Sequence, residues 1–142
     1  MNIIKIEEDF ITYLAQALNL TIDTDIYRGG IPADAEYGIG VIWGTEIKNS
    51  SFYGFRPRTW NVQILAKFDE HDKAMILLTK LNDIFPCSEF SCGETNFIAV
   101  YTSDATDLYS TMENNKEKIC LSFNIVIPVL TEGAQEESTI EQ

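Results

Sequence analysis

Few residues of this sequence combine the types and the spacing that catalysis requires. His71 is the single histidine, and it lies in the acidic run Asp69-Glu70-His71-Asp72, where a carboxylate could orient the imidazole as a general base or a metal ligand. The same run is typical of the first turn of a helix, where acidic side chains interact favourably with the helix dipole. We interpret His71 as a solvated residue at a helix start and predict no catalytic residue.

Motifs for cofactors and nucleophiles are absent from the sequence. It contains no Gly-x-Ser-x-Gly elbow, Walker loop, Gly-x-Gly-x-x-Gly or His-Glu-x-x-His. The glycines of residues 37–40 match a glycine loop only superficially and favour a turn or close strand packing. A cation could be gathered by four acidic residues, but their spacing is not that of a calcium loop: Asp104, Asp107, Glu113 and Glu117. We therefore predict no cofactor and no metal.

The cysteines do not form a recognisable site. Cys87, Cys92 and Cys120 make an odd number, and none of their spacings is a Cys-x-x-Cys pair of the kind used in zinc or redox sites. Reduced thiols are the default interpretation. Oxidation of Cys87 and Cys92 to close a small loop is the alternative.

One segment stands out because of its aromatic and basic residues. Residues 52–58 hold three aromatic side chains and two of the three arginines in the chain: Phe52, Tyr53, Phe55, Arg56 and Arg58. Aromatic residues and arginine are enriched at protein interfaces, and an acidic protein that self-associates needs a complementary basic patch. We predict a subunit interface here. The alternative is that the aromatics cover the core and the arginines pair with nearby carboxylates.

Hydrophobic periodicity predicts the elements that must position these residues. Apolar residues at helical spacing predict helices over 6–18, with Glu7, Glu8 and Asp9 in the first turn, and over 69–84, with Asp69 as N-cap. Alternating apolar residues predict strands at 20–26, 39–43, 60–68, 97–101 and 119–129. Residues 28–32, the polar segment 44–57 and the polar stretch 102–117 are predicted as loops and turns.

This order of elements indicates an α+β fold. We expect a mainly antiparallel mixed sheet of about five strands, with two helices packed on one face. The 142-residue length fits one domain, which we place at residues 1–130. Residues 131–142 are rich in glutamate and are predicted to form a disordered acidic tail.

The charge of the chain restricts its partners. Ten basic residues against 22 acidic ones give a net charge of -12, which argues against binding nucleic acid by phosphate neutralisation. A surface that repels DNA is compatible with this charge. No segment reads as a signal peptide or a membrane span, so we expect no membrane partner.

The pattern from residue 57 to 130 resembles the minor capsid and tail-terminator proteins of long-tailed bacteriophages. The basic loop leads into the strand Thr59-Trp60-Asn61-Val62-Gln63-Ile64-Leu65-Ala66-Lys67, an acidic-capped helix with Ala74, Leu77 and Leu81 follows, and a strand closes the fold. The resemblance implies a sheet with two helices on one side and no catalytic residue. The acidic tail has no counterpart in the family's pattern.

The resemblance also implies a place in the virion and a set of partners. Proteins of this family form a ring, usually a hexamer, at the head-proximal end of the tail tube, where they stop tube polymerisation and face the head connector. The implied partners are other copies of the chain, the tail-tube protein, the connector and DNA that passes without specific binding. Synthesis would take place in the host cytoplasm. The alternative is an acidic, dimeric, secretion-type chaperone that binds a client segment; such proteins usually close with a helix.

Overall fold

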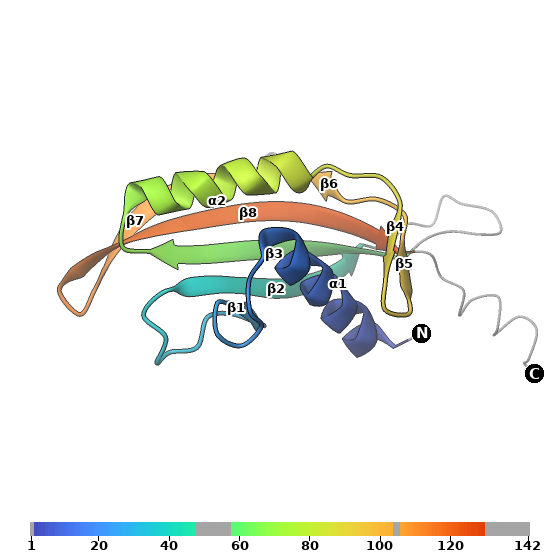
Figure 1. The fold of residues 1–142 in the computed structure, drawn as a ribbon, viewed down its shortest axis with the longest axis horizontal. Coiled ribbons are helices and arrows are strands. Elements are labelled where there is room, and N and C mark those ends of the chain that lie inside the picture. Colours follow the sequence, from blue (N-terminus) through green and yellow to red (C-terminus); the bar gives the residue numbers. More distant parts are fainter. Residues whose placement is uncertain (1, 48–57, 104–105, 130–142) are drawn as a thin grey trace, which may run out of the picture.

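The computed structural model describes residues 2–47, 58–103 and 106–129. These ranges contain two helices and eight strands, in the order α1 (Ile3–Leu18), β1 (Ile26–Arg28), β2 (Gly38–Ile47), β3 (Arg58–Phe68), α2 (His71–Ile84), β4 (Phe90–Cys92), β5 (Thr95–Phe97), β6 (Tyr101–Thr102), β7 (Asp107–Glu113) and β8 (Lys116–Val129). In Figure 1 the long strands β2, β3 and β8 run side by side, α2 lies along them and α1 crosses them obliquely.

All eight strands belong to one sheet built around β8. The strand order is β1-β2-β3-β8-β5-β4, and β6 and β7 also pair with β8. One edge of β8 pairs with β3, residues 119–129 with the whole of β3, and the other edge is shared by β7, β6 and β5. Every pairing is antiparallel except that of β1 with β2, so the predicted α+β class with a mainly antiparallel mixed sheet is confirmed, and the estimate of five strands was too low.

The sheet has one apolar face, which we call the helix-covered face. Alternate residues of β3 on this face are all buried, namely Trp60, Val62, Ile64 and Ala66, and the β8 residues that pair with them are buried as well, namely Ile127, Ile125, Phe123 and Leu121. Because side chains alternate between the faces of a strand, this register places one continuous apolar surface beneath the helices. Burial of each large side chain contributes roughly 1.5–3 kcal/mol to stability.

Helix α1 begins earlier than the sequence predicts. The Asn2 side chain accepts a hydrogen bond from the backbone N–H of Ile4 at 2.9 Å and caps a helix that starts at Ile3. Glu7 and its two acidic neighbours therefore lie beyond the first turn, contrary to our prediction. On the buried side, the ring of Phe10 packs at centroid distances of 5.9 Å from Phe97 and 6.1 Å from Phe85, which joins α1 to the region after α2.

Helix α2 spans most of the predicted range, but its cap is different. Glu70 occupies the N-cap position without a side-chain cap bond, while Asp69, the predicted cap, accepts a hydrogen bond from Lys73 Nζ at 2.8 Å. The Asp69 carboxylate, which we expected to cap the helix, thus forms an i,i+4 ion pair with Lys73 instead. The buried side of α2 carries Leu77 and Leu81, as its periodicity predicts.

The predicted strand at 20–26 is wrong. Residues 23–25 form a turn, Ile22 makes only an isolated bridge with Ile26, and Ile26 alone of this segment lies in a strand. The Asp25 carboxylate accepts a hydrogen bond from the Thr21 N–H at 3.0 Å, and Asp23 has a left-handed φ of 69°. Aspartate side chains that bond the nearby backbone favour turns over strands, which explains why alternation failed here.

The polar stretch at 102–117, predicted as a turn region, forms strands instead. It contains the end of β6, all of β7 and the start of β8, and β7 is joined to β8 by Asn114 and Asn115, with φ of 53° and 64°. Two consecutive left-handed residues form the tight turn that suits a β-hairpin. The segment 44–57 also begins as strand, because β2 continues through a bulge between Trp43 and Glu46 to Ile47.

The predicted strand at 97–101 is divided in the structure. β5 ends at Phe97 and β6 begins at Tyr101, while Val100 between them exchanges backbone hydrogen bonds with Cys87. Val100 is fully buried although it lies in neither strand, so the prediction of one strand over 97–101 is wrong.

The opposite face of the sheet carries a loop instead of helices. Residues 29–37 cross it at β2, where a Cβ on Gly40 would lie only 2.8 Å from Gly30 Cα. Further along this loop, Glu36 and Tyr37 reach Lys118 of β8. Only a glycine at position 40 permits such a close approach between the loop and the sheet.

Candidate functional site

Of the predicted interface residues, Arg58 alone is described. Phe52, Tyr53, Phe55 and Arg56 lie outside the described residues, as does the predicted acidic tail at 131–142. Arg58 is the first residue of β3, so the last residue of the predicted patch lies at one end of the sheet.

Arg58 interacts with groups of its own chain. Its Nε and Nη2 donate to the two carboxylate oxygens of Glu46 at 3.0 and 2.8 Å, and its guanidinium carbon lies 5.0 Å from the centroid of the Trp60 ring. The bulge in β2 brings Glu46 opposite Trp60, next to Arg58. A bidentate ion pair of this kind holds the guanidinium in a fixed orientation. The Arg58 side chain remains 38% exposed, so part of it is accessible to a partner.

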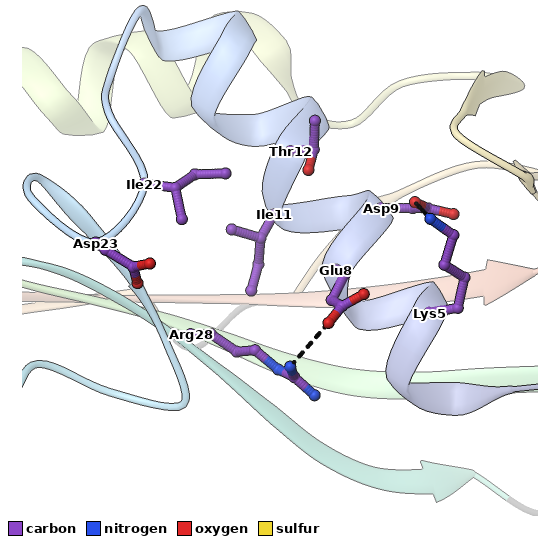
Figure 2. A pocket seen from close by; sticks show the side chains of 8 residues that line it. All are labelled: Lys5, Glu8, Asp9, Ile11, Thr12, Ile22, Asp23 and Arg28. Atoms are coloured by element: carbon purple, nitrogen blue, oxygen red, sulfur yellow. Dashed lines mark hydrogen bonds and ion pairs between the residues drawn. The ribbon is translucent and has the colours of Figure 1, made fainter.

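A shallow groove of about 450 Å³ lies beside α1 (Figure 2). Its lining residues come from α1, from the turn before β1 and from the end of β1: Lys5, Glu8, Asp9, Ile11, Thr12, Ile22, Asp23 and Arg28. Figure 2 shows Arg28 reaching toward Glu8, with which it forms an ion pair at 3.2 Å; Glu7 pairs with Arg28 at the same distance. These two ion pairs of Arg28 connect α1 to the end of β1.

The buried carboxylate of Asp9 joins α1 to the hairpin of β4 and β5. Its Oδ2 accepts hydrogen bonds from the Thr95 hydroxyl at 2.6 Å and from the Glu94 N–H at 3.2 Å, and Lys5 lies 3.3 Å from Oδ1. The hydrogen bond between the Lys5 ammonium and Asp9 raises the pKa of Lys5 above its ordinary value. Gly93, with a φ of 61°, leaves room for the carboxylate, because any Cβ there would overlap it. Asp9 therefore has a structural role.

On the opposite face of the sheet, Lys118 is a buried cation with its own partners. It is only 1% exposed, its Nζ donates to Glu36 at 2.9 Å, and it lies 4.1 Å from the centroid of the Tyr37 ring. The hydrogen bonds from Lys118 and from Lys116 hold the pKa of the Glu36 carboxyl below its usual range. This arrangement fastens the loop at 29–37 to β8.

The remaining candidates for chemistry are dispersed. His71 is exposed at the first residue of α2, and no group of three or more His, Cys, Asp or Glu side chains within residues 2–47, 58–103 and 106–129 could hold a metal ion. Glu113 pairs with Lys67 at 2.9 Å, and Asp104 lies outside the described residues. Cys87, Cys92 and Cys120 are free thiols. Burial is the main cause that raises the pKa of the Cys87 thiol, which makes it a weaker nucleophile at neutral pH.

The fold has a counterpart among solved structures. A chain of the virion of a native gene transfer agent (GTA) particle superimposes with a TM-score of 0.52 and 12% sequence identity, over 82% of this chain and 84% of that one. At this identity the match shows a shared fold. No family model and no curated protein sequence matches this chain. In the part of the chain that the structure describes, neither helix is long and apolar enough to cross a membrane.

Sequence reasoning missed the polar contacts that organise both faces. Asp9 was read as a carboxylate of the first helical turn, Lys118 was assigned no role, and Arg28 was assigned only to a turn. Apart from Lys5, four positions before Asp9, their partners lie 20 or more positions away, for example 86 between Asp9 and Thr95 and 82 between Glu36 and Lys118. Periodicity reports only local neighbours. The one sequence feature that could have indicated such a contact was an aspartate on the buried side of α1, because a buried carboxylate requires polar partners.

Proposed function

We propose that this chain is a structural subunit of a phage-like virion, and more narrowly a tail-terminator or minor capsid protein. Copies of the chain would form a ring, by analogy a hexamer, at the head-proximal end of the tail tube, stop tube growth and join the tail to the head connector. The observation that carries the proposal is the shared fold with a GTA virion chain, which extends over more than four fifths of both chains.

Two further observations support a structural role. The reactive side chains in the described ranges are either dispersed or engaged in ion pairs that fasten one element to another. The net charge of -12 would let DNA pass through the lumen of a ring without being retained. Both fit a protein that works through its surfaces.

We assign the contact between neighbouring subunits of the ring to residues 52–58, which the sequence predicts as a subunit interface. Arg56 and Arg58 would face acidic groups of the neighbouring subunit, and Phe52, Tyr53 and Phe55 would supply apolar contact. In this arrangement Arg58 keeps its bond to Glu46 and presents its exposed side to the neighbour.

Tube growth provides the test. The tail-tube protein of the same particle would be polymerised with and without this chain, and tube lengths measured by electron microscopy. We expect capped tubes of limited length with the natural chain and unlimited growth with Arg56→Glu. Lys80→Glu, the same charge change on the exposed side of α2, is the control and should still cap. Equal capping by both variants would remove the patch from the proposal, and no capping by the natural chain would refute the tail-terminator role.

A further inference from the structure

The outer edge of β7 differs from the other edges of the sheet. β1 and β4, which end the strand order, have three residues each, and β2 carries a bulge. Short strands and bulges are two ways in which proteins prevent an edge from pairing with another chain. β7 has seven residues in unbroken register with β8 and contains no proline, lysine or glycine. Its two acidic residues, Asp107 and Glu113, stand at its ends, so within the described ranges the middle of β7 lacks the features that usually protect an edge.

The hairpin geometry identifies the backbone groups that point outward from β7. In a two-residue hairpin the residues beside the turn, here Glu113 and Lys116, form a hydrogen-bonded pair, and hydrogen-bonded pairs recur at every second residue. The N–H and C=O groups of Leu108, Ser110 and Met112 therefore point away from β8. Among the described residues, no backbone group bonds to them.

We infer that two copies of this chain associate by antiparallel pairing of their β7 strands, centred on Ser110. In this register Ser110 faces Ser110 of the second copy, and Leu108 faces Met112 of the second copy, so every outward group meets another outward group. A register shifted by one residue on either copy would place outward groups against inward ones. Shifts of two residues keep outward groups opposed but pair fewer residues, so the register centred on Ser110 is the one that pairs all seven residues of both strands.

The side chains agree with this register. Tyr109 faces Thr111 of the second copy, a pair of an aromatic and a β-branched residue, which stabilises antiparallel sheets. Met112 is 68% exposed and Tyr109 39% exposed in the single chain, and both would lose contact with water on pairing. Asp107 faces Glu113 of the second copy, a like-charged pair whose repulsion is reduced because Glu113 is ion-paired with Lys67 at 2.9 Å. A second copy thus satisfies the outward backbone groups and covers two exposed side chains of the edge.

This contact is separate from the proposed ring. A twofold contact joins each subunit to one other and cannot by itself close a sixfold ring, so the two contacts use different surfaces. The β7 pairing does not depend on the tail-terminator role, and its failure would leave that role untouched.

Cross-linking tests the pairing directly. Ser110→Cys would be compared with Thr79→Cys on the exposed side of α2, both in a chain with Cys87→Ser and Cys92→Ser, under mild oxidation. Paired residues of this type lie at about 5.5 Å between Cα atoms, within disulfide range. We expect disulfide-linked dimers to form at least about fivefold faster with Ser110→Cys. Equal rates for the two variants would overturn the inference.

A proline variant provides a second readout. Ser110→Pro removes one outward N–H and should leave the hairpin intact, because proline is tolerated where an edge N–H faces solvent. In sedimentation equilibrium, the natural chain and Ser110→Ala should both have an average mass above that of the 16.1 kDa monomer. Ser110→Pro should be folded and should associate more weakly. Association of Ser110→Pro equal to that of Ser110→Ala, or a natural chain monomeric at about 100 µM, would contradict the inference.

Discussion

The two faces of the central sheet are stabilised in different ways. On the helix-covered face, the β3 and β8 residues from Trp60 to Ala66 and from Leu121 to Val129 that point to the helices are all at most 2% exposed and all apolar. On the opposite face the sheet carries Lys67, Ser122 and the buried Lys118, and a loop is fastened there by an ion pair. The helix-covered face is stabilised by the apolar area that it removes from water, and the opposite face is stabilised by a few specific polar contacts.

This difference leads to an order of sensitivity to mutation. Substitutions under the helices should cause the largest losses, the buried carboxylate that fixes α1 an intermediate loss, and the ion pair on the opposite face a small and pH-dependent one. Each step of the order can be measured separately.

The largest effect is expected from Leu81→Asp. Leu81 is 0% exposed in the core beneath α2, so a carboxylate there would be buried without a partner, and the loss should exceed about 4 kcal/mol. A loss of this size removes most or all of the stability of a domain at the lower end of the ordinary range, about 5 kcal/mol. Circular dichroism should show an unfolded chain.

The matched control for Leu81→Asp is Ile76→Asp on the exposed side of the same helix. Ile76 is 56% exposed, so this variant should melt close to the natural chain. A normal melting curve for Leu81→Asp would show that the helix-covered face is not the core.

An intermediate effect is expected from Asp9→Ala. The change leaves the Thr95 hydroxyl and the Glu94 N–H without their acceptor, which should cost roughly 2–4 kcal/mol. Urea unfolding measures the loss. Glu8→Ala, which removes only the exposed ion pair with Arg28, should cost less than about 1 kcal/mol. Equal losses for the two variants would mean that burial of Asp9 contributes little.

The smallest effect is expected from Glu36→Gln, and it depends on pH. The pKa of Glu36 is lowered in the folded chain, so its charge contributes stability above the ordinary pKa of about 4.3, and that contribution disappears as the pH falls through the folded value. Glu36→Gln should therefore lower the melting temperature at pH 7, and the difference should shrink as the pH falls below the ordinary pKa and vanish below the folded one. A difference that stays constant as the pH is lowered, or that matches Glu89→Gln, would contradict this role.

The sequence was sufficient to predict the helix-covered face and insufficient for the rest. Residues 60–68, 69–84 and 119–129 were assigned correctly because their apolar residues repeat with the period of the element they form. β7 was missed because it is largely exposed, and exposed strands need no apolar alternation. The pair Asn114-Asn115 was the available signal, since asparagine favours the left-handed conformation of a hairpin turn.

The candidate site was less predictable than the fold. Arg58 is predicted as an interface residue, and its bidentate bond to Glu46 depends on a bulge in β2 that periodicity does not reveal. The contacts of Asp9 and Lys118 depend on the packing of distant segments, which the order of residues does not specify. The predicted interface itself remains a prediction.

The central claim is that the chain is part of a virion, and the number of copies in purified particles tests it most directly. Quantitative mass spectrometry with isotope-labelled peptides of this chain would measure its amount relative to the major capsid protein. A ring subunit should be present at a small fixed number, about six per particle for one hexameric ring. Absence of the chain from intact particles would contradict the account.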